Sequence, residues 1–240
     1  MIRLKNIEVR YGKTIAVDNL SFTFEGGRIY GIIGPNGAGK SSLIKAMVGI
    51  ITDHTGNVYF EDKEYRKKSR KIKFDLGYAP ETTELFDYLT AREYLQMISE
   101  IKHLPAGRNG IEDLLAKLTL EDQADQIIVG YSHGMRKKTA LAAALLGPPR
   151  YIILDEALNG LDPVAMYNVR QLLRSFASRR STILLSSHIL ELVENWCDHI
   201  LIMKNGRLLA AYSQDQIRSI CAESGSDFSE HFIRLVEDDD

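Results

Sequence analysis

Apolar and polar residues alternate near the start of the chain, in RLKNIEV (3–9) and again in LSFTF (20–24). A repeat of two residues is typical of strands that are buried on one face only. Turn-forming residues follow these segments, in YGK (11–13) and EGG (25–27). The N-terminal part of the chain is therefore predicted to be rich in strands.

Later apolar runs are continuous, which favours parallel strands that are covered on both faces. These runs are RIYGIIG (28–34), YIIL (151–154) and TILLSS (182–187). The segment DHILIMKNGRLLAA (198–211) is different, because Asn205-Gly206 stands between two apolar stretches. That arrangement predicts a β-hairpin with a type I′ turn.

Helices are predicted between these strands. Residues 35–50 are predicted to form a glycine loop that opens a helix, and residues 87–120 to be helical with a break near LPAGRNG (104–110). TALAAALL (139–146) is a strong helix former that Gly147 and two prolines end. The acidic end VEDDD (236–240) is predicted to be a solvated tail.

The composition sets broad limits on the function. A chain of 240 residues suffices for one large domain, or for one domain with a smaller lobe. Its net charge of −2 gives no overall attraction to nucleic acid. No apolar run approaches the roughly 18 residues that span a bilayer, and the start of the chain lacks the apolar core of a signal peptide. We therefore expect no nucleic-acid partner and no membrane span within this chain.

Some features carry no specific chemistry. The basic run YRKKSRKIK (65–73) is expected to be a solvated face, with contact to anionic lipid headgroups as the alternative. The cysteines, Cys197 and Cys221, lack the spacing of a metal site, so reduced thiols in the cytosol are expected.

The residues GPNGAGKS (34–41) fit the phosphate-loop pattern G-x-x-x-x-G-K-[ST]. Gly37 and Gly39 let the backbone wrap closely around phosphate oxygens. Successive N–H groups and the positive end of the following helix then favour an anion. Lys40 can reach the β- and γ-phosphates of a nucleotide, and the Ser41 hydroxyl can ligate Mg²⁺. A strand before the motif and a helix after it are the context that the motif requires.

Acidic residues follow the apolar run YIIL, at the carboxyl edge where ligands bind to parallel sheets. Asp155 suits a ligand of Mg²⁺, and Glu156 suits a general base that orients the attacking water. Alone, this pattern also fits a solvated strand end, but the phosphate loop favours the catalytic interpretation. His188 follows TILLSS to the same edge, where its imidazole can contact the γ-phosphate or the water.

With these motifs in this order, the chain resembles the ATP-binding subunit of an ABC transporter over nearly its whole length. Tyr11 matches the aromatic residue that stacks on adenine, and Val17 matches an apolar contact beside it. Ser132 and Gly134 match positions of the signature sequence Leu-Ser-Gly-Gly-Gln, which acts on the ATP of the other subunit. Segment LNGLD, up to Asp162, matches the loop that communicates across the dimer.

The resemblance implies a full set of site residues. The expected ATP contacts are Tyr11, Val17, Asn36, Gly37, Ala38, Gly39, Lys40, Ser41 and Ser42, with Ser132 and Gly134 from the second subunit. The expected catalytic residues are Lys40, Glu81, Glu156 and His188. The expected Mg²⁺ ligands are Ser41, Glu81 and Asp155.

The resemblance also implies an α/β fold of the P-loop NTPase type, with a mixed core sheet, an N-terminal antiparallel β-subdomain and a small helical lobe. One ABC ATPase domain (1–240) would comprise a core lobe (1–80 and 150–215), a helical lobe with the signature (82–147), and a C-terminal helix with the acidic tail (216–240). The implied activity is a Mg²⁺-dependent ATPase that powers a membrane transporter.

Partners follow from the same resemblance. A second ATPase subunit, identical or related, would form a head-to-tail dimer with two ATP sites. A separate membrane-spanning permease would dock near Glu81, which places the chain on the cytoplasmic face of the membrane. The segment YAPETTELFDYLTAREYL (78–95) is similar to the export branch, which includes drug and bacteriocin-resistance transporters.

The chain departs from the family pattern at several positions: Glu81 replaces Gln, His133 replaces Gly, Met135 replaces Gln, and Ala157 replaces Pro. Glu81 still offers an oxygen to Mg²⁺ or water. His133 is either a tolerated side chain at the dimer face, or an added donor or proton-dependent charge near the phosphates.

Two other functions stay open on the sequence. The unusual signature fits a binding module that uses ATP as a clamp, with slow or no turnover. A non-transport ABC ATPase of the DNA-repair or translation type is the second alternative. Such proteins usually carry two ATPase units or a coiled-coil insertion, and the sequence contains neither.

Overall fold

The computed structural model of the protein describes residues 1–105 and 110–237, which fall into two compact units. The first unit comprises Met1–Ser69 and Thr182–Asp240, and the second comprises Arg70–Ser181. The lobe boundaries that the family resemblance implies stay a prediction.

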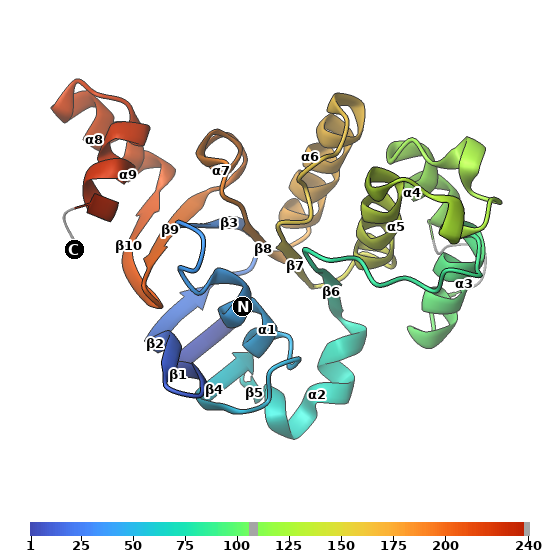
Figure 1. The fold of residues 1–240 in the computed structure, drawn as a ribbon, viewed down its shortest axis with the longest axis horizontal. Helices are drawn as coiled ribbons and strands as arrows, with labels where there is room; N and C mark the ends of the chain where they lie inside the picture. The colour runs from blue at the N-terminus through green and yellow to red at the C-terminus, as the bar shows by residue number, and fades with distance from the viewer. Residues whose placement is uncertain (106–109, 238–240) are drawn as a thin grey trace. The chain divides into compact units, whose positions relative to one another are not determined.

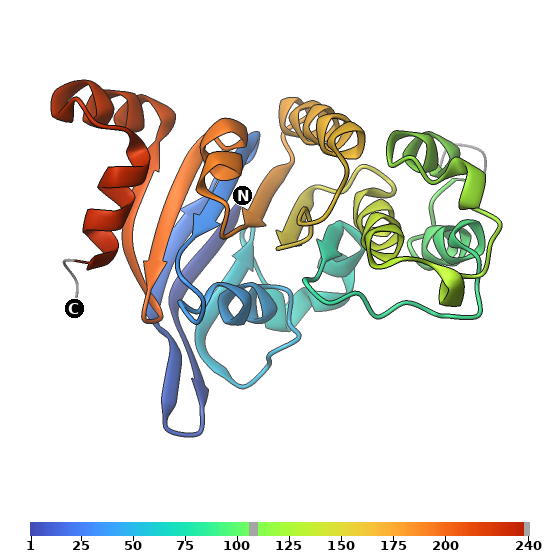
Figure 2. The same ribbon diagram turned by 45° about the horizontal axis from the view of Figure 1, so that its top comes forward.

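An antiparallel sheet forms the N-terminal part of the first unit, as the alternating pattern predicts. Its strands are β1 (Ile2–Tyr11), β2 (Thr14–Phe24), β4 (His54–Phe60) and β5 (Lys63–Glu64), in the order β2-β1-β4-β5. Figure 2 shows β1 and β2, in blue, as a long hairpin. The apolar residues of β1 are buried, and polar residues between them are exposed, so one face of the sheet meets the core.

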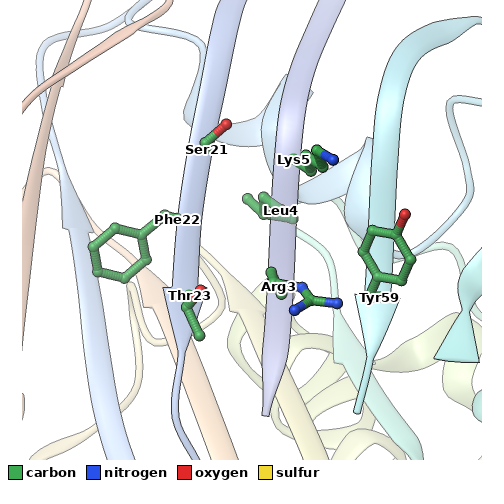
Figure 3. Close-up of a pocket in the computed structure, with 7 residues that line it drawn as sticks. All are labelled: Arg3, Leu4, Lys5, Ser21, Phe22, Thr23 and Tyr59. Carbon is green, nitrogen blue, oxygen red and sulfur yellow. The ribbon is translucent and has the colours of Figure 1, made fainter. Parts of the chain in front are cut away.

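The other face of this sheet carries a pocket of about 490 Å³ (Figure 3). The Arg3 guanidinium lies over the Tyr59 ring, 4.8 Å from its centroid. Lys5, Ser21 and Thr23 also line the pocket. None of its lining residues belongs to the predicted ATP site.

The first unit contains four further strands: β3 (Arg28–Ile33), β8 (Thr182–Ser186), β9 (His199–Lys204) and β10 (Arg207–Ser213). They follow the order β10-β9-β3-β8 (Figure 1). Strand β3 is parallel to β8 and β9, whereas β10 is antiparallel to β9. At the β9–β10 turn, φ is 49° for Asn205 and 80° for Gly206. Positive φ at both positions is the property of a type I′ turn, so this prediction is confirmed.

The helices of the first unit are α1 (Lys40–Met47), α7 (Leu190–Trp196), α8 (Gln214–Ser224) and α9 (Phe228–Glu237). The predicted solvated tail was wrong at its start, because α9 continues to Glu237, and residues 238–240 lie outside the described residues. Helix α9 buries Phe228 beside Tyr212 and accepts a 2.6 Å hydrogen bond from the buried Lys204 at the Val236 carbonyl. These contacts stabilise the last helix as far as Glu237.

Helix α2 (Tyr65–Phe74) carries the basic run and crosses the boundary between the two units. Arg70, Lys71 and Lys73 are exposed, whereas Ile72 is buried. The exposed cations agree with the expected solvated face.

The second unit pairs β6 (Leu76–Ala79) with β7 (Tyr151–Asp155) in parallel. Its helices are α3 (Ala91–Ile101), α4 (Ile111–Lys117), α5 (His133–Leu145) and α6 (Pro163–Ser178), with 3₁₀ turns at Glu121–Gln123 and Ile128–Gly130. Helix α5 packs closely on β6, because a Cβ on Gly77 would lie 1.8 Å from the Ala144 carbonyl oxygen.

The helix predictions for this unit are confirmed in outline. The chain breaks between α3 and α4 as expected, although residues 106–109 of that break lie outside the described residues. Helix α5 begins at His133, because the Ser132 hydroxyl accepts the Met135 N–H at 3.3 Å and caps the helix.

Candidate functional site

The phosphate loop connects β3 to α1, as the motif requires. Gly37 and Gly39 have φ of 81° and 99°, a region that L side chains rarely adopt. A Cβ on Gly39 would also lie 2.1 Å from the Ala16 carbonyl oxygen and 3.3 Å from the Gly206 Cα. The loop therefore needs glycine at position 39 for its backbone conformation and for its packing.

The β9–β10 hairpin braces this loop. The Gly206 N–H donates to the Ala38 carbonyl at 3.0 Å, and the Gly206 carbonyl accepts the Asp18 N–H at 2.9 Å. The Arg207 side chain donates to the Asp18 carboxylate at 2.8 Å. These bonds fix the backbone of the loop from the side of β2 and the hairpin.

Lys40 is buried inside the loop, with 7% of its surface exposed. Its ammonium donates to the carbonyls of Gly34 at 2.7 Å and Pro35 at 3.2 Å. Asn36 and Gly37 are exposed at the tip of the loop, and Ser41 and Ser42 are half-buried. A lysine ammonium and an exposed, glycine-rich backbone are donors suited to phosphate oxygens.

Tyr11 lies at the end of β1 and is 53% exposed, with its hydroxyl 3.5 Å from the Ser42 hydroxyl. An exposed ring beside the loop fits a platform for a nucleotide base. Val17 is completely buried, so a contact between its side chain and adenine stays a prediction. His188 is exposed after β8, and the preceding Ser187 donates its N–H to the Ile32 carbonyl of β3 at 3.1 Å. The structure thus brings His188 to the strand edge from which the phosphate loop starts.

In the second unit, predicted carboxylates gather at the ends of paired strands. Asp155 is the last residue of β7 and is 1% exposed, whereas Glu81 is exposed just beyond β6. Tyr78 pairs with Ile153, so Tyr78 and Asp155 lie on the same face of the two strands. Burial, together with the negative charges of Asp155 and Glu81, raises the pKa of Tyr78 well above its usual range. Sequence analysis did not single out this phenol.

Glu156 follows Asp155 with a left-handed backbone, φ 50°, and is 8% exposed. Such a conformation is uncommon for a residue with a Cβ and is typical of functional sites. The Asn159 side-chain amide donates to the Glu156 Oε2 at 2.7 Å. In the sequence, Asn159 is part of LNGLD and shows no pattern that assigns it a role of its own.

The signature residues lie at the start of α5. Ser132 caps the helix as an acceptor, so its hydroxyl hydrogen is still able to donate to a phosphate. Gly134 is close to the loop after β7, because a Cβ there would lie 3.5 Å from the Gly160 carbonyl oxygen. His133 is exposed in the first turn, and Met135 is half-buried.

Asp162 ends the loop after β7 and caps α6 by accepting the Ala165 N–H at 2.9 Å. It also pairs with Lys138 of α5 at 2.5 Å. The bond from Lys138, helped by that from the Ala165 N–H, lowers the pKa of Asp162 to about 2. The ion pair fixes the far end of the loop to the helix that carries the signature.

The donors expected for Mg²⁺ are all oxygens, which is the chemistry that this ion prefers. Within the described residues, His, Cys, Asp and Glu form no group of three or more that could hold a metal by themselves. Mg²⁺ commonly takes one or two carboxylates together with substrate phosphates. Ser41 in the first unit and Asp155 in the second each offer an oxygen of this kind, and their joint role as Mg²⁺ ligands stays a prediction.

Comparison with known proteins identifies the family of the chain. A family model described as "ABC transporter" matches residues 17–159. The chain belongs to the ABC transporter family. Across 98% of its length, this ABC protein superposes on a solved ATP-binding subunit of an ABC transporter with a TM-score of 0.90, 28% identity and 99% of that chain covered. The predicted fold class is thereby confirmed.

Curated relatives of the ABC protein include transport and export ATP-binding proteins. It is 32% identical to the lantibiotic transport ATP-binding protein SrtF of Streptococcus pyogenes, over 90% of this chain and 92% of that protein. It is 33% identical to the bacitracin transport ATP-binding protein BcrA of Bacillus licheniformis, over 91% of this chain and 71% of that protein. A Nod factor export ATP-binding protein of Burkholderia orbicola is 34% identical to it, over 87% of this chain and 69% of that protein.

These findings show that the chain is an ATP-binding subunit of an ABC transporter with export-type relatives. Within residues 1–105 and 110–237, no helix combines the length and apolar character needed to cross a membrane.

Proposed function

We propose that this subunit hydrolyses ATP to ADP and phosphate in a Mg²⁺-dependent reaction, and that the reaction powers export. The observation that carries the proposal is the pair of buried carboxylates at the end of β7. Asp155 and Glu156 are almost completely buried, and Glu156 has a strained, left-handed backbone. A solvated strand end needs neither property.

Binding would rest on the first unit. Lys40 would turn from the carbonyls of its own loop to the β- and γ-phosphates, while the backbone N–H groups of residues 37–41 bind phosphate oxygens. Tyr11 would stack on the adenine ring. Ser41, Asp155 and Glu81 would hold Mg²⁺, whose charge offsets that of the phosphates when it is bound.

Chemistry would rest on Glu156 as the general base. Its carboxylate orients a water and takes a proton as the water oxygen bonds to the γ-phosphorus. The bond from that phosphorus to the bridging oxygen breaks, and ADP leaves with the electron pair. His188 would contact the γ-phosphate or the water and hold them in line.

The active form would be a head-to-tail dimer in which Ser132 and Gly134 of one subunit contact the ATP of the other. A solved bacterial ABC transporter cassette is dimeric, and another structure of that fold holds ADP and phosphate. The exposed Ser132, at the positive end of α5, has the location that such a contact requires.

A separate membrane-spanning permease would complete the transporter, with this subunit on the cytoplasmic face of the membrane. The relatives named for lantibiotic transport, bacitracin transport and Nod factor export support the direction. The exposed Phe86 and Tyr88, which follow Glu81, offer an apolar surface for that partner.

The test compares phosphate release by the purified protein and by Glu156→Gln, with Mg²⁺ and with EDTA. We expect Glu156→Gln to bind ATP normally and to lose about 100-fold or more in kcat. Glu121→Gln, an exposed glutamate of the same unit, is the matched control and should retain full turnover.

The alternatives give different results. An ATP-clamped binding module would bind ATP without steady-state phosphate release in the wild-type protein, with or without the membrane partner. Near-normal hydrolysis by Glu156→Gln would remove Glu156 from the role of base. Co-purification with ribosomes or DNA, in place of a membrane-spanning polypeptide, would favour a non-transport ATPase.

A further inference from the structure

The loop from Glu156 to Asp162 connects β7 to α6, and α5 holds it at more than one point. At its far end, Asp162 pairs with Lys138. In its middle, the Asn159 carbonyl accepts a hydrogen bond from the Lys137 ammonium at 3.1 Å. Adjacent lysines of one helix therefore fix the loop that follows the proposed base.

Lys137 is unusual because it is buried, with 8% of its surface exposed. Taking a lysine ammonium out of water is unfavourable unless polar groups receive it. The Asn159 carbonyl is such a group, so the burial of Lys137 favours one position of Asn159. A solvated lysine on the surface of α5 would impose no such restriction.

The side chain of Asn159, held in this position, in turn restricts the conformation of Glu156. The amide donates to Glu156 Oε2 at 2.7 Å, and the Asn159 N–H lies 3.4 Å from the Glu156 carbonyl oxygen. A donor bound to one carboxylate oxygen limits rotation of the Glu156 side chain.

We propose that Asn159 is a positioning residue for Glu156, and that Lys137 sets the position of Asn159 from α5. The proposal rests on the proposed function of Glu156 as the base. Asn159 does not touch ATP or water in this role. It holds the carboxylate in one conformation, so that the proton-accepting oxygen is already directed when the nucleotide binds.

Kinetics provide the first test. Removing a hydrogen bond to a charged group typically loses about 10–100-fold, so Asn159→Ala should lower kcat by that factor and leave KM for ATP within about twofold. Asn168→Ala is the matched control. It removes a 2.9 Å hydrogen bond that the Asn168 side-chain amide donates to the Lys117 carbonyl elsewhere in the same unit. An unchanged or increased kcat in Asn159→Ala would overturn the proposal.

A double-mutant cycle separates positioning from general damage. With Glu156→Gln already present, Asn159→Ala should cause no further loss of the residual rate. As a single variant, Lys137→Met should lower kcat. Added to Asn159→Ala, it should lower kcat little further, since both residues act on the same carboxylate. If the losses in kcat of the two single variants multiplied in either double variant, the proposed contacts from Lys137 through Asn159 to Glu156 would be contradicted.

A structural readout distinguishes this inference from the proposed function. Crystal structures should show a single Glu156 conformer in the wild-type protein and several in Asn159→Ala. One unchanged conformer in the variant would refute the positioning role, whether or not the protein hydrolyses ATP. Absence of turnover in the wild-type protein would instead refute the proposed function.

Discussion

At the scale of single residues, Gly37 and Gly39 share a left-handed backbone but differ in their surroundings. A Cβ on Gly37 would meet no atom within 4 Å, whereas one on Gly39 would lie 2.1 Å from the Ala16 carbonyl oxygen. Identical substitutions therefore separate backbone strain from steric overlap.

Alanine at these positions should have unequal effects. Gly37→Ala introduces strain alone and should lower the free energy of unfolding by about 1 kcal/mol. Gly39→Ala adds displacement of β2 and should lower it by about 3 kcal/mol or more. Urea unfolding of both variants measures the difference. Equal losses in the free energy of unfolding would show that β2 moves away from a Cβ at position 39 without destabilising the protein.

Residue types explain which parts of the site could be predicted. The phosphate-loop pattern sufficed to place Gly39 and Lys40 between a strand and a helix, and the apolar run YIIL to place Asp155 at a strand end. Their roles toward phosphate and Mg²⁺ stay predictions. Asn159 and Lys137 were not predictable, because their role depends on distances between β7, its loop and α5. The sequence does not show whether a lysine near a signature motif is solvated or buried.

At the scale of elements, the N-terminus of α6 combines a helix cap with an ion pair. The pKa of Asp162 is lowered to about 2, from an ordinary value of 3.8, chiefly by Lys138. The stabilisation is present above the ordinary pKa and is lost as the pH falls toward the folded value. Because the carboxylate is 40% exposed, screening limits its contribution to about 1 kcal/mol.

Asp162→Asn should retain the cap and lose the ion pair, since asparagine also caps helices. We expect the free energy of unfolding of the variant to be lower than that of wild type by about 1 kcal/mol at neutral pH. This difference should decrease toward about pH 3. Denaturant unfolding across this pH range measures it. A gap that stays constant with pH would mean that the charge of Asp162 does not contribute.

Elements were predictable where their pattern is local. The alternation in β1 and the Asn205-Gly206 turn sufficed for the N-terminal strands and the last hairpin. Helix α9 was not predicted over its full length, since its stability depends on Phe228, which packs beside Tyr212, and on the bond from Lys204. Helix α5 begins where Ser132, a residue expected to contact ATP, also caps the helix.

At the scale of the whole molecule, the proposed dimer divides each ATP site between two chains. Lys40→Ala damages the phosphate loop, and Ser132→Arg damages the signature, so each variant alone should be inactive. In an equal mixture, half of the dimers would be mixed, and each would regain one intact site. We expect about a quarter of the wild-type phosphate release.

A matched mixture serves as the control for this experiment. Lys40→Ala and Glu156→Gln affect the same half of the proposed site, so their mixture should stay inactive. Recovery in that mixture, or none with Ser132→Arg, would contradict the head-to-tail arrangement.

The hairpin that braces the phosphate loop has a consequence for how the chain can be divided. The family match ends at residue 159, yet Gly206 bonds to Ala38 inside the loop. A chain cut at the limits of that match would keep every residue of the motif and lose the support that shapes it. We therefore expect a fragment cut at the limits of sequence similarity to bind ATP more weakly than one that includes the β9–β10 hairpin.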